Sequence, residues 1–182
     1  MNKNNTIYSV MTSLFVVLIS AGAYMKVSIP GNPVPVVLQN MFILLSGLLL
    51  GEKWGITCVL TYLLLGFLGL PVFAGNSSGP AAFYGPTAGY LISYIPAVFV
   101  IGFISEIGKK YRVIFYSAAV LSAIIITYVF GVTWLKIKLN INFSKAMTLG
   151  FYPFIIWDIM KASAAVAIAS FIKPVINNVF EE

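Results

Sequence analysis

The chain has 182 residues, of which 60% are hydrophobic and only 9% are charged, and its formal net charge is +6. Soluble domains carry about 25% charged residues. The composition therefore excludes an ordinary soluble enzyme and indicates a protein that crosses a lipid bilayer several times. The sequence contains no histidine, which removes the common Ser-His, zinc and general-base sites. The basic residues lie between apolar runs, as membrane topology requires, so we expect no nucleic-acid partner.

Six apolar runs are candidates for membrane spans, each of which needs ~20 mostly apolar residues. In chain order they cover residues 7–24, 36–51, 54–73, 88–104, 113–135 and 146–172. Prolines after the first run break any helix there, because each removes a backbone donor. A segment rich in Gly, Pro, Asn and Ser, residues 74–87, follows the third run. We predict an all-α integral membrane protein, with residues 1–182 as one domain. Its six transmembrane helices form one bundle, with a long ordered loop between the third and fourth.

Six spans place both termini on one side of the membrane. That side would hold Lys3, Lys53, Lys109, Lys110, Arg112 and Lys173, and the other side Lys26, Lys136, Lys138 and Lys145. The positive-inside rule then predicts that both termini are cytoplasmic and that the loops at 26–35 and 74–87 face outside. An alternative for the first run is a cleaved signal peptide, because Ala21-Gly22-Ala23 resembles a cleavage pattern. The length of the run favours a retained span.

Asp158 and Lys161 are the most informative residues, because they lie near the middle of the sixth apolar run. A charge inside the membrane costs ~3 kcal/mol on insertion scales. A spacing of three puts both on one helical face, where they either form a structural ion pair or line a polar ligand pocket. Trp157 is beside them and is either a wall of such a pocket or part of the bulk packing. Gln39, at the head of the second run, needs partners for its amide, from a neighbouring helix or a ligand.

A second informative segment covers residues 66–90, which contain six of the 15 glycines of the chain. Irregular backbone at membrane depth survives only where protein or a cavity satisfies its polar groups. Gly75 and Asn76 lie in the middle of this segment, so a loop could place backbone donors and one amide over a ligand. A flexible connection is the alternative interpretation. Tyr84 and Tyr90 favour a packed lid.

Three stretches of the sequence resemble the BioY proteins, the biotin-specific substrate-binding (S) components of energy-coupling factor (ECF) transporters. They are residues 29–35 together with Gln39, residues 66–90, and residues 157–161. The resemblance extends over essentially the whole chain, including its length and the number of spans.

The resemblance implies a six-helix protein of the bacterial cell membrane that captures biotin from outside with high affinity. Such a component does no chemistry and needs no cofactor, with biotin as the transported ligand. It docks on a transmembrane scaffold subunit that carries two cytoplasmic ATPases. This agrees with the sequence, in which no GxxxxGK[ST] phosphate-binding motif occurs.

For the site, the resemblance implies that Asp158 accepts the ureido N–H groups of biotin and that Asn76 complements the ureido head. Lys161 then meets the carboxylate of biotin or holds Asp158 ionised. Apolar surface would be covered by Trp157, Tyr84 and Tyr90, with Gln39 and Gly75 also in the substrate-binding set.

Three other functions are compatible with parts of the sequence. The first is an S component for another vitamin, such as thiamine or riboflavin. The second is a small membrane enzyme with Lys161 as base and Ser163 as nucleophile, although a spacing of two points these side chains to different helix faces. The third is a channel subunit, which would need polar stripes on several spans.

Overall fold

The structure is a computed structural model that describes residues 3–107 and 112–181. Its elements are α1 (Lys3–Tyr24), β1 (Lys26–Val27), β2 (Val36–Val37), α2 (Gln39–Phe67), the 3₁₀ helix η1 (Pro80–Tyr84), α3 (Ala88–Ile107), α4 (Arg112–Leu139), α5 (Phe143–Gly150) and α6 (Ile155–Glu181). Within the described residues, α1, α2, α3, α4 and α6 are long and apolar enough to cross a membrane. The predicted all-α membrane fold is therefore confirmed.

The second and third predicted spans are joined in α2, which folds back on itself at Gly51. Gly51 has φ 76° and ψ −172°, a backbone region essentially restricted to glycine. A Cβ placed on Gly55 would lie 3.4 Å from the Cα of Gly47. Residues eight apart in a straight helix are separated by about 12 Å along its axis. The arms 39–50 and 52–67 are therefore antiparallel, and each of the six predicted spans has a helical counterpart.

The sixth predicted span, 146–172, is wrong in its boundaries. It is divided into α5 and α6 by a turn at residues 151–154. Pro153 explains this break, because proline lacks a backbone N–H and disfavours helix in the residue before it. At its other end α6 continues through Pro174, where we expected the span to close. Asp158 consequently lies in the first turn of α6, not near the middle of a span.

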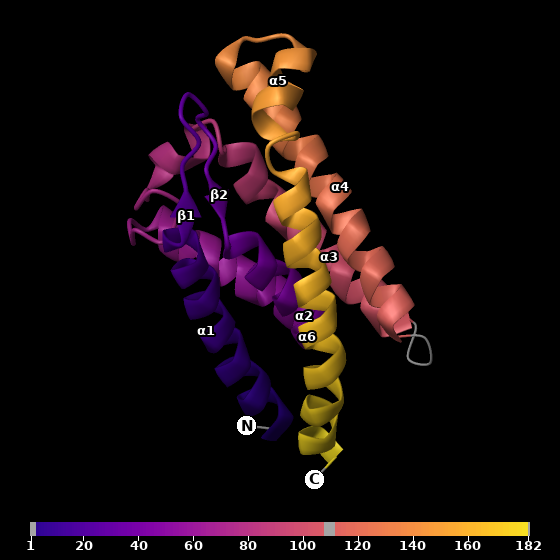
Figure 1. The fold of residues 1–182 in the computed structure, drawn as a ribbon. Coiled ribbons are helices and arrows are strands. Elements are labelled where there is room, and N and C mark those ends of the chain that lie inside the picture. The colour runs from indigo at the N-terminus through magenta and orange to yellow at the C-terminus, as the bar shows by residue number, and fades with distance from the viewer. Residues whose placement is uncertain (1–2, 108–111, 182) are drawn as a thin grey trace.

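The irregular segments gather at one end of the bundle, and both chain termini lie at the other (Figure 1). The Pro-rich stretch after α1 forms an antiparallel β1–β2 hairpin, in which Lys26 pairs with Val37 and Val27 with Val36. The side chain of Asn32 donates to the carbonyl of Leu149 at 2.8 Å, which ties this hairpin to α5.

The loop between α2 and α3, residues 68–87, is ordered as predicted. It contains η1 and returns to the end of α2, where the Gly79 N–H donates to the Gly66 carbonyl at 2.7 Å. The Tyr24 hydroxyl donates to the Pro71 carbonyl of the same loop. The loop is thus fixed to α1 at Pro71 and to α2 at Gly79.

The fold-back of α2 generates the first prediction. Gly51→Ala should destabilise the protein by about 1–3 kcal/mol, because the ε region of backbone space is accessible essentially to glycine alone. A Cβ at this position would also lie 2.3 Å from Oε1 of Glu106. The measurement is the thermal unfolding midpoint of the detergent-purified protein. The matched control is Gly85→Ala, at extended backbone with φ −74° and with its nearest neighbour atom 3.5 Å away. Equal midpoints for the two variants would contradict the strained fold-back.

Candidate functional site

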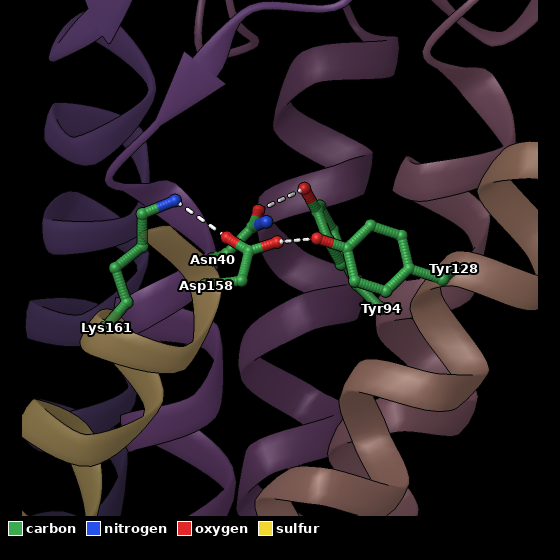
Figure 2. A network of polar contacts seen from close by, with 5 residues as sticks. All are labelled: Asn40, Tyr94, Tyr128, Asp158 and Lys161. Carbon is green, nitrogen blue, oxygen red and sulfur yellow. Dashed lines mark hydrogen bonds and ion pairs between the residues drawn. The ribbon is translucent and has the colours of Figure 1, made fainter. Parts of the chain in front are cut away.

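A buried carboxylate is the centre of a polar network between α4 and α6 (Figure 2). Lys161 Nζ donates to Oδ1 of Asp158 at 2.8 Å, and the hydroxyl of Tyr128 donates to Oδ2 at 2.5 Å. The side chains of Lys161 and Asp158 are only 10% and 12% exposed. Both oxygens of the carboxylate therefore have a donor, and the predicted pairing of the two charges is present.

A second pair of polar side chains lies next to this carboxylate and comes from α2 and α3 (Figure 2). The hydroxyl of Tyr94 donates to Oδ1 of Asn40 at 2.8 Å. Asn40 follows the first residue of α2, and Tyr94 lies in the second turn of α3. Four helices thus contribute one polar layer, which none of them could form alone.

This polar layer lines a cavity whose free volume is about 50 Å³. Its polar lining residues are Gln39, Asn40, Thr87, Tyr90, Tyr94, Thr127, Tyr128, Asp158 and Lys161, and its apolar lining residues are Val34, Pro35, Val36, Val37, Phe73, Ala74, Leu91 and Phe154. The lining comes from β2 and the residues before it, from the loop after α2, from the first two turns of α2, α3 and α6, and from Thr127 and Tyr128 of α4. The cavity therefore lies at the end of the bundle away from the termini.

Gln39 brings an unused donor to the cavity. Its side chain is 1% exposed, and its amide nitrogen has no hydrogen-bond partner among the described residues. A buried donor without a partner costs about 1–3 kcal/mol. A bound molecule with a carbonyl or carboxylate oxygen would remove this cost.

Three residues that the sequence assigned to the site lie outside the cavity. Gly75 and Asn76 are exposed in the loop after α2, and Tyr84 is 68% exposed at the end of η1. The loop reaches the cavity through Phe73 and Ala74 instead. Gly75 and Asn76 both have positive φ, 79° and 59°, so the chain turns away directly after Ala74.

Trp157 also lies outside the lining of this cavity. Successive residues of a helix point about 100° apart. With Asp158 facing inward, Trp157 faces outward and is 53% exposed. Tyr90 does line the cavity, as predicted, and its hydroxyl donates to the Gly150 carbonyl at 2.7 Å.

Several site residues were missed by the sequence reasoning, above all Asn40, Tyr94 and Tyr128. Each stands in an apolar run and carries a polar atom that a bilayer would leave unsatisfied. That mismatch is the signal that could have identified them. Tyrosine is too common at membrane interfaces for the type of residue to be informative by itself.

The chemistry of this site is that of binding. Within the described ranges no three His, Cys, Asp or Glu side chains come together to hold a metal. The cavity contains one carboxylate, so a pair of carboxyl groups for acid and base catalysis is missing from its lining. Each oxygen of Asp158 retains a lone pair, and the amides of Gln39 and Asn40 add donors. The arrangement suits a ligand that carries both N–H and C=O groups.

Comparison with known proteins identifies close relatives of the whole chain. The BioY family model matches residues 1–178. A probable biotin transporter BioY of Pyrococcus horikoshii is 43% identical over 160 residues, which cover 87% of this chain and 91% of that protein. The biotin transporter BioY of Thermotoga maritima is 40% identical over 164 residues, with 90% and 94% covered.

A solved structure shares the fold. The crystal structure of the S-component for biotin from an ECF-type ABC transporter superimposes with a TM-score of 0.89 at 29% sequence identity. The match covers 96% of this chain and 94% of that chain. The match therefore extends over nearly the whole of both chains.

The ion pair gives the second prediction. Lys161→Met should destabilise the protein by about 3–5 kcal/mol, because it leaves the charge of Asp158 buried without its cation. Adding Asp158→Asn to this variant should restore part of the stability, since no unpaired charge then remains. Thermal unfolding in detergent measures both effects. Lys138→Met removes an exposed cation and is the matched control. If Lys161→Met alone were as stable as this control, the ion pair would contribute nothing to the stability of the fold.

Proposed function

The chain belongs to the BioY family, and we propose that it is the biotin-binding S component of an ECF transporter. The observation that carries this proposal is the cavity, in which the paired carboxylate of Asp158 faces the amides of Gln39 and Asn40 between apolar walls. The chain is a multi-pass membrane protein and a transporter component. The relatives of this chain are transporters, so we set aside the alternative of a small membrane enzyme.

The donors and acceptors of the cavity complement those of biotin. The ureido ring of biotin carries two N–H donors and one C=O acceptor, and its bicycle is otherwise apolar. Asp158 accepts from the N–H groups, and the amide nitrogens of Asn40 and Gln39 are available to the ureido oxygen or to the carboxylate. Phe73 and Phe154 cover the bicycle. Lys161 contacts Asp158, and its role is to pair with that carboxylate.

The remaining sequence-predicted residues have a secondary place in this proposal. Gly75, Asn76 and Tyr84 belong to the loop whose residues Phe73 and Ala74 close one side of the cavity. Their contribution is to fix that loop. Trp157 faces away from the cavity and has no part in binding. No resident cofactor is required, because biotin is carried unchanged.

Energy for uptake has to come from other subunits. The sequence contains no GxxxxGK[ST] motif, and the structural neighbour is one component of an ECF-type ABC transporter. The partners we propose are a transmembrane scaffold subunit and two cytoplasmic ATPases, in addition to the lipid bilayer.

The proposed orientation has both termini in the cytoplasm of a bacterial cell and the cavity opening outside. Both termini lie at one end of the bundle (Figure 1). Of the charges used for the orientation, Lys53, Arg112 and Lys173 belong to this end, and Lys109 and Lys110 lie outside the described residues. The positive-inside rule favours this side as the cytoplasmic one.

Binding of biotin is the direct test of the proposed function. Calorimetry on the detergent-purified chain should show saturable binding of about one biotin per chain, with thiamine and riboflavin as controls that do not bind. The physical reason is that biotin presents two ureido N–H groups on a small, otherwise apolar bicycle, whereas thiamine carries a cationic ring and riboflavin a larger tricyclic one. Binding of thiamine or riboflavin in place of biotin would move the chain to another substrate, and binding of none of the three would refute the proposal.

The role of Asp158 gives a sharper prediction. Asp158→Asn should weaken biotin binding by more than tenfold, because hydrogen bonds to a charged acceptor contribute about 1.5–3 kcal/mol. The neighbouring variant Trp157→Phe should bind as the wild type does, since its side chain points away. Comparable affinities for Asp158→Asn and Trp157→Phe would make the carboxylate a structural residue only.

A further inference from the structure

A second hollow lies between α4 and α6, on the side of the site that faces the chain termini. The two helices are in contact at Tyr128 and Asp158 and diverge from there towards the terminal end of the bundle (Figure 1). Residues 113–121 of α4 and 159–171 of α6 line the resulting space of about 550 Å³. We call it the α4–α6 groove. Phe171, 80% exposed, stands on its rim, so the groove opens to the outside of the bundle.

The lining of the groove offers few free polar groups with which an occupant would have to form hydrogen bonds. The hydroxyls of Ser163 and Ser170 donate to carbonyls of their own helix at 2.9 and 2.7 Å. Most other residues of its lining are apolar. An apolar gap of this size at membrane depth loses dispersion contacts on both walls unless something fills it. A hydrocarbon chain in the groove would restore these dispersion contacts.

Positive charge stands at the terminal end of the groove. Arg112 directly precedes the first groove residue of α4, and its guanidinium forms no ion pair with any residue that the structure describes. Lys173 lies two residues beyond the last groove residue of α6 and donates to the Leu49 carbonyl at 2.7 Å. Basic groups between membrane helices at one leaflet bind anionic lipid headgroups.

We propose that the α4–α6 groove binds one anionic phospholipid, with an acyl chain between the helices and the phosphate at Arg112. A packed helix is the other conceivable occupant, because Ser163 and Ala167 form a small-residue seam that permits close helix approach. Phe171 is the next residue of that seam and projects outward. It obstructs a straight helix, whereas a flexible acyl chain passes beside it. The proposal does not depend on which substrate the cavity binds.

Native mass spectrometry of the full detergent-purified chain tests this site, with phosphatidylglycerol and phosphatidylcholine of identical acyl chains as probes. We expect one bound phosphatidylglycerol, with about fivefold higher occupancy than phosphatidylcholine, as one favourable basic contact provides. Ala167→Phe fills the groove and should lower this occupancy at least as much. Ala118→Phe, at an exposed residue of α4 outside the groove lining, is the matched control and should bind lipid as the wild type does.

The charge is tested separately. Arg112→Gln should reduce phosphatidylglycerol to the occupancy of phosphatidylcholine, and Lys138→Gln, at the opposite end of α4, should not. The thermal unfolding midpoint of each variant shows that it is folded, and Arg112→Gln decides the matter if Ala167→Phe does not fold. Equal occupancy of the two lipids in the wild type would overturn the proposal. So would a dimer of the chain that Ala167→Phe dissociates while lipid binding is unchanged, because a second copy would then occupy the groove.

Discussion

The buried charge of Asp158 is the constraint on which the rest of the structure depends. A carboxylate removed from water is tolerated only where a cation and hydrogen-bond donors surround it. Lys161 provides the cation from the same helix, but the donor on the second oxygen is Tyr128 of α4. The charge therefore fixes the distance between α4 and α6 at one point along their length. The cavity lies on one side of that point and the α4–α6 groove on the other.

Glycines give the aromatic walls of the cavity their positions. A Cβ on Gly66 would lie 2.0 Å from the ring of Phe73, and a Cβ on Gly131 would lie 2.2 Å from the ring of Tyr90. Each ring thus occupies space that the side chain of any other residue at the glycine position would fill. Tyr90 is held further by its hydrogen bond to the Gly150 carbonyl. The walls are therefore rigid before a ligand enters, which lowers the entropic cost of binding.

The parts of the fold that depend on composition could be predicted from the sequence. The parts that depend on the direction of a side chain or on a turn of the backbone could not. Apolar length located the spans, and the cost of charge in a bilayer singled out Asp158 and Lys161. The same reasoning overlooked Pro153, because the surrounding residues are apolar enough to continue a span. It also assigned Trp157 to the site because it is adjacent in sequence to Asp158, and Asn76 because it lies in the glycine-rich loop. A helix rotates 100° per residue, so adjacent residues on it face different surroundings, and only packing decides which one faces inward.

The break at Pro153 determines what the site can bind. A continuous sixth helix would place Asp158 in a helix interior. With the break, Asp158 stands in the first turn of α6, and its own N–H donates to the Phe154 carbonyl at 2.9 Å. The positive end of the helix dipole then lies close to this carboxylate. The same break turns Phe154 into the cavity. One proline thereby places both a hydrogen-bond acceptor and an apolar surface at the start of α6, the two features that a small ring with N–H groups requires.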